Sequence, residues 1–71
     1  MKITPQQTEK LLKGNHKFSQ LGFSLLLTRL KGVYTKTPTP ETLKACNVEM
    51  NAFLGKFQSI MSADYAIIAK L

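Results

Sequence analysis

Residues 33–43 read VYTKTPTPETL, and this stretch divides the chain into two helical regions. Proline fixes its own backbone angle and disfavours helix at the residue before it, so Thr37-Pro38-Thr39-Pro40 interrupts any helix that reaches it. The same residues start the next helix, because Thr39 can act as the N-cap and Pro40 suits the first helical position. We therefore expect a connection over residues 33–39 and a helical region on either side of it.

The second helical region is expected to run from Pro40 towards Leu71. Its apolar residues recur at helical spacing and form one wide stripe. Asp64 interrupts this stripe near its end. Residues 62–64 are therefore either a kink in one long helix or the cap of a short last helix, and both interpretations stay open.

The first helical region is expected over residues 5–31. Thr4-Pro5 repeats the start signal, and Gln7 is placed to complete a capping box. Gly32 is the expected end, because glycine tolerates the left-handed conformation that closes many helices. Gly14-Asn15 is a possible break, yet the apolar stripes keep their phase across it, so one bent helix and two separate helices fit equally well.

The first region is apolar around most of its surface. Between Phe18 and Tyr34, apolar side chains cover roughly two thirds of the circumference at 100° per residue. Such a helix must be covered from more than one side, and the second region can cover only one of them. The residues expected in the core or at an interface are Leu11, Phe18, Leu21, Phe23, Leu25, Leu26, Leu30, Leu43, Met50, Phe53, Leu54, Phe57, Ile60 and Met61.

These patterns predict an all-α fold, because no segment alternates apolar and polar residues as a strand does. The expected architecture is a helical hairpin of two long regions, which breaks at 14–15 or 62–64 would subdivide into three or four helices. We expect a small bundle that is completed by self-association, with a dimer favoured. The alternative is a monomer whose shorter helices enclose the central one.

Size and composition narrow the classes of protein further. With 71 residues, of which 44% are apolar, the chain is expected to form one small domain over residues 1–71 and not a disordered tail. A single cysteine and a single histidine leave no intrachain disulfide and no closed zinc site, so we expect no metal and no cofactor. No membrane-spanning run or secretory signal is visible, so a membrane is an improbable partner and the cytoplasm is the expected location.

The net charge of +6 is concentrated in the first half of the chain. Residues 1–36 hold seven lysines and arginines against one glutamate, whereas residues 37–71 are balanced. On a continuous helix Lys10, Lys13 and Lys17 would form a basic ridge. The predicted basic surface comprises Lys10, Lys13, Lys17, Arg29, Lys31 and Lys36. It either attracts an acidic partner or is a solvated face, and the sequence leaves both open.

No catalytic pattern is present. His16 has no nucleophile nearby in the sequence, Cys46 lies on an apolar stripe, and the glycines form no phosphate-binding loop. The leading hypothesis is a non-enzymatic helical binding module, of an accessory, regulatory or inhibitor type, that contacts an acidic protein or a second copy. The alternative is a nucleic-acid-binding protein that contacts phosphates without sequence preference.

Overall fold

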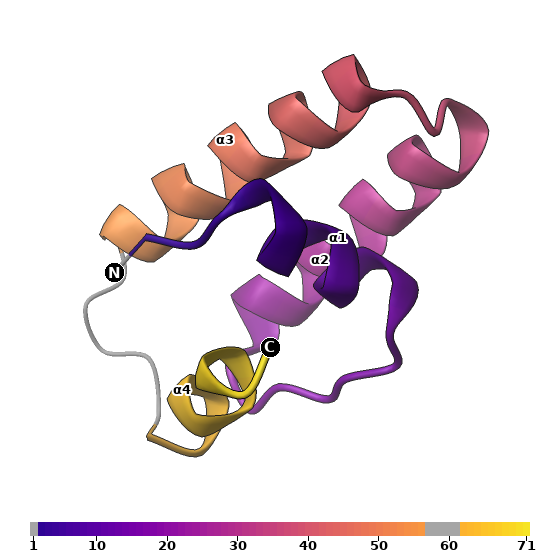
Figure 1. Ribbon diagram of the computed structural model, residues 1–71. Helices are drawn as coiled ribbons and strands as arrows, with labels where there is room; N and C mark the ends of the chain where they lie inside the picture. The colour runs from indigo at the N-terminus through magenta and orange to yellow at the C-terminus, as the bar shows by residue number, and fades with distance from the viewer. Residues whose placement is uncertain (1, 57–61) are drawn as a thin grey trace.

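The computed structural model describes residues 2–56 and 62–71, and Figure 1 shows the arrangement of its helices. The helices are α1 (Pro5–Lys13), α2 (Leu21–Lys36), α3 (Pro40–Lys56) and α4 (Ser62–Ala69). No strand occurs among the described residues. The all-α prediction is confirmed, and the described residues form a small bundle with four helices.

Both predicted helix starts are confirmed, and side chains satisfy backbone groups at each. At α1, the Thr4 hydroxyl accepts a hydrogen bond from the Gln7 amide (3.2 Å), and the Gln7 side chain accepts one from the Thr4 amide (2.8 Å). At α3, the Thr39 hydroxyl accepts from the Thr42 amide (3.1 Å). Short-range capping chemistry therefore sets these two starts.

The first helical region differs from the sequence prediction at two points. α1 ends at Lys13 and residues 14–20 are not helical, so the interpretation as one bent helix is wrong. The expected end at Gly32 is also wrong, because α2 continues through it to Lys36. No described glycine has the positive φ that a glycine helix end uses. α2 stops at Thr37 instead, where the following Pro38 disfavours further helix.

The helices surround one core. Figure 1 shows α2 and α3 as a hairpin, with α1 against both and α4 near the start of α2. The buried apolar residues are Ile3, Leu11, Leu12, Phe23, Leu27, Leu30, Cys46, Met50, Leu54 and Ile68. Partly buried residues against this core include Phe18, Leu26, Leu43 and Phe53. Of the predicted core or interface residues, Phe57, Ile60 and Met61 lie outside the described residues.

A buried carboxylate attaches α4 to the segment that precedes α2. Asp64 lies in the first turn of α4 and is 1% exposed. Its two oxygens accept hydrogen bonds from the backbone amides of Ser19 (2.8 Å) and Gln20 (3.0 Å). Asp64, which interrupts the apolar stripe, therefore lies in a short last helix, as one of the two interpretations predicted. The Asp64 side chain binds a segment that is distant in the sequence.

Two asparagines of α3 hold the residues before α1. Asn51 accepts a hydrogen bond from the Ile3 amide (2.8 Å) and donates one to the Ile3 carbonyl (3.1 Å). Asn47 donates to the same carbonyl (3.0 Å) and to the buried Thr8 hydroxyl (2.9 Å). These contacts fix the start of α1 against α3, and α1 packs on α2 as well.

Candidate protein-binding site

Three large apolar side chains of α2 are exposed. The exposed fraction is 71% for Leu21, 64% for Leu25 and 44% for Val33. Leu21 and Leu25 belong to the residues predicted for the core or an interface, and the structure places them outside the core of this chain. They follow each other at a spacing of four residues, so they are neighbours on one helical face.

The exposed Leu25 borders α3. A side chain at Gly22 would touch the Phe53 ring (3.4 Å), and Arg29 forms an ion pair with Glu49. Gly22 and Arg29 therefore both lie on the side of α2 that faces α3. Leu25 lies three residues after Gly22 and four before Arg29, so it is a neighbour of both, turned about 40–60° further round the helix.

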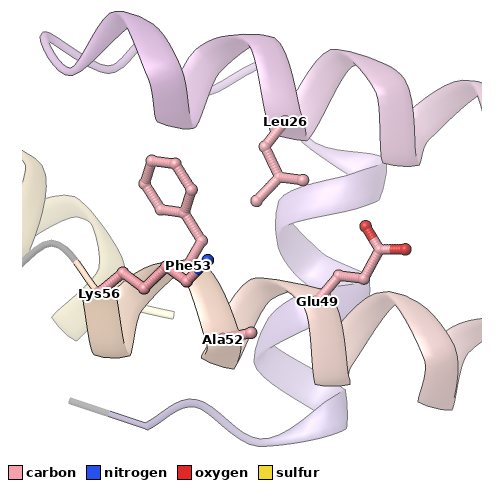
Figure 2. A pocket seen from close by; sticks show the side chains of 5 residues that line it. All are labelled: Leu26, Glu49, Ala52, Phe53 and Lys56. Atoms are coloured by element: carbon pink, nitrogen blue, oxygen red, sulfur yellow. The ribbon is translucent and has the colours of Figure 1, made fainter.

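A hollow of about 330 Å³ lies between α2 and α3 at this edge. It is lined by Leu26 of α2 and by Glu49, Ala52, Phe53 and Lys56 of α3. In Figure 2, Leu26 and Phe53 point towards each other from the two helices, and the Lys56 side chain lies along α3.

Phe53, which lines the hollow, contacts the aromatic side chains of the core. The Phe53 ring lies 5.6 Å from that of Phe23, which in turn meets Phe18 edge to face at 4.7 Å. Because Phe23 is fully buried, it fixes the position of the Phe53 ring. We call the hollow together with the neighbouring Leu25 the α2–α3 face, comprising Leu25, Leu26, Glu49, Ala52, Phe53 and Lys56.

The charges at this face are unevenly paired. Glu49 is bound to Arg29, and both side chains are about half exposed. Lys56 is exposed and has no carboxylate partner among the described residues. At this face the described residues therefore leave the charge of Lys56 without an ion-pair partner.

Two lysines of the predicted basic surface donate hydrogen bonds within the chain. The Lys10 ammonium donates to the Leu71 carbonyl (3.1 Å). The Lys31 ammonium donates to the Gly14 carbonyl. Both ammonium groups keep their positive charge, but each is directed towards a backbone carbonyl of this chain.

The predicted basic ridge does not exist as a continuous helical row. α1 ends at Lys13, so Lys17 lies in the connection and not on that helix. Lys13 is 3.7 Å from Glu9, four residues before it. Lys17 and Lys36 are exposed, on different elements. With Arg29 on Glu49, the six predicted residues are distributed over α1, α2 and the connection between them.

The Cys46 thiol and the Tyr34 hydroxyl are each held within the fold. Cys46 is 2% exposed, and burial raises the pKa of its thiol, with a further contribution from the charge of Glu49. The Tyr34 hydroxyl donates to Glu9 (2.8 Å), and this hydrogen bond is the main reason that the pKa of Tyr34 is raised. Within residues 2–56 and 62–71, no three metal-ligating side chains come together.

The sequence reasoning missed three residues of the face: Glu49, Ala52 and Lys56. They recur at three and four residues and form a row on α3, a signal that the sequence does carry. Their proximity to α2 depends on how the two helices pack, and the spacing alone cannot give that.

None of the helices in the described part of the chain is long and apolar enough to cross a bilayer. Comparison of the chain with protein-family models, with curated proteins and with solved structures gives no match.

Proposed function

We propose that this chain is a non-enzymatic helical module that binds another protein through the α2–α3 face. The observation that carries the proposal is a hollow lined by Leu26 and Phe53, with Leu25, which is 64% exposed, next to it on α2 and Leu21, which is 71% exposed, one turn further along the helix. Single exposed apolar side chains are ordinary, whereas a cluster of them beside a hollow is typical of interaction sites. Burying one leucine side chain contributes about 1.5–3 kcal/mol, so covering this cluster favours association.

The absence of enzymatic activity is part of the same proposal. It is supported by the state of the potential nucleophile, because the Cys46 thiol is buried and its raised pKa disfavours the reactive thiolate. A buried free thiol also fits the reducing cytoplasm, which is the location we propose.

Site-specific photo-cross-linking tests the proposal. A photoreactive amino acid replaces Leu25 at the α2–α3 face or, as the control, the exposed Gln6 of α1. The full chain is irradiated in the cells that produce it. We expect a covalent adduct with one protein at position 25 and none at position 6. No adduct at position 25, or the same adducts at both positions, would contradict the proposal.

Nucleic-acid binding is the second candidate, and the net charge of +6 in residues 1–36 favours it. A phosphate-binding surface should bind any duplex and should lose affinity steeply between about 50 and 200 mM salt. Fluorescence anisotropy with a labelled duplex measures this. No binding at 50 mM salt would exclude this candidate and leave the protein-binding proposal unaffected.

A further inference from the structure

We infer that the occupant of the α2–α3 face is an acidic amphipathic helix of another protein and not a second copy of this chain. The inference rests on the proposed function and adds the chemistry of the partner. It is drawn from the shape of the face and from the charges that remain available on it.

The shape of the face suits a helix. The hollow of about 330 Å³ has room for an apolar side chain between Leu26 and Phe53, and the exposed Leu25 extends the apolar surface on α2. A helix that binds in a groove presents apolar residues at spacings of three, four and seven, which match successive positions along such a surface.

The charge of the face suits acidic flanks on that helix. α2 contains no acidic residue, and its Arg29 is already paired with Glu49. On α3, Glu49 is occupied by Arg29, while Lys56 lies beside the hollow without a carboxylate among the described residues. A partner that places a carboxylate next to its apolar anchor can pair with Lys56.

A second copy has few carboxylates to offer. The chain has four acidic residues. Glu9 is bound to Tyr34 and Lys13, Glu49 is bound to Arg29, and Asp64 is buried on two backbone amides. Only Glu41 is exposed without a partner among the described residues. Two copies, each with a net charge of +6, would moreover repel each other as they approach.

Binding of designed peptides tests the inference. The probe is a fluorescent helical peptide of about 18 residues, with leucine at spacings of three and four and glutamate at flanking positions. The control peptide has lysine in place of every glutamate. We expect the acidic peptide to bind the full chain at least about tenfold more tightly than the basic one, with amide shifts in NMR spectra centred on the α2–α3 face.

Two matched variants locate the charge effect. Lys56→Glu changes the charge beside the hollow, and Lys44→Glu makes the same change at another exposed position of α3. We expect Lys56→Glu to weaken binding of the acidic peptide about five- to tenfold and Lys44→Glu less than about twofold. Ala52→Trp, which fills the hollow, should abolish binding while circular dichroism stays unchanged.

Three results would overturn the inference: equal binding of both peptides, equal losses from both lysine variants, or a dimer mass in light scattering at micromolar concentration. Each leaves the proposed function standing if position 25 still cross-links to a protein. Failure of the cross-link contradicts the proposed function itself, so the two failures are distinguishable.

Discussion

Replacing Asp64 by asparagine should destabilise the chain strongly despite preserving the shape of the side chain. In the native structure each carboxylate oxygen accepts one backbone amide, from Ser19 at 2.8 Å and from Gln20 at 3.0 Å. Asparagine has one amide oxygen and can accept from only one of them. Its amino group then faces the other amide, so that two donors oppose each other.

The magnitude follows from the two hydrogen bonds. A bond to a charged acceptor contributes about 1.5–3 kcal/mol, a neutral one about 1 kcal/mol, and an unsatisfied buried donor costs about 1–3 kcal/mol. Loss of the Asp64 charge removes part of its desolvation cost, which offsets some of this. We expect a net loss of about 2 kcal/mol. The free energy of unfolding of a chain of this length is roughly 4–10 kcal/mol, so the loss is a substantial fraction of it.

The assay is urea and thermal unfolding followed by circular dichroism, with Glu41→Gln as the matched control. Glu41 is exposed in the first turn of α3, and its replacement changes the net charge equally but removes only a helix-dipole interaction of about 0.3–1 kcal/mol. We expect the midpoint of Asp64→Asn to fall by about 8–16 °C. Equal losses in both variants, or unchanged hydrogen exchange at Ser19 and Gln20, would refute the reasoning.

Three further predictions concern single residues. Gly32→Ala should stabilise α2 by about 1 kcal/mol, because a methyl group there meets no atom within 4 Å and alanine favours helix; a thermal midpoint that does not rise would contradict this. The hydrogen bond from Tyr34 to Glu9 raises the pKa of the Tyr34 hydroxyl above 10.0, so the stability that this bond contributes is complete below pH 10 and is lost as the pH rises through the raised pKa. In an ultraviolet titration, Glu9→Gln should lower the pKa of Tyr34, and an unchanged titration would count against the hydrogen bond. The Cys46 thiol should react with an aromatic disulfide at least about tenfold more slowly in the native chain than in urea, and comparable rates would mean that the thiol is accessible.

The sequence predicted those features of the fold that depend on neighbouring residues. Thr4-Pro5 and Thr39-Pro40 start helices because a threonine hydroxyl and a proline ring act within one turn. The expected end at Gly32 is wrong because glycine permits a helix end without requiring one, and the continuation of α2 to Lys36 places Tyr34 against the core, where its hydroxyl donates to Glu9. The matching phase of Leu11, Phe18 and Leu25 across Gly14 does not reflect a continuous helix, because residues 14–20 are not helical.

Contacts between distant residues could not be predicted in this way. Asp64 and Asn51 bind the backbone of residues 44 to 48 positions away, and a backbone amide carries no signature of its own in a sequence. The candidate site has the same limit. The exposure of Leu25 and the position of Lys56 beside Phe53 follow from the packing of α2 on α3, whereas the periodicity of each helix indicates only which residues share a face.

Because most of the acidic side chains bind other parts of the fold, the chain should tolerate substitution of its exposed lysines better than substitution of its acidic residues. Glu9, Glu49 and Asp64 each bind another element of the fold, whereas Lys2, Lys17 and Lys44 are exposed without ion-pair partners in the described part of the chain. A library of variants selected for folding should therefore lose these lysines readily and retain the three acids. Substitutions of these lysines can therefore lower the isoelectric point from about 9.8, whereas substitutions of the three acids, which would raise it, destabilise the fold.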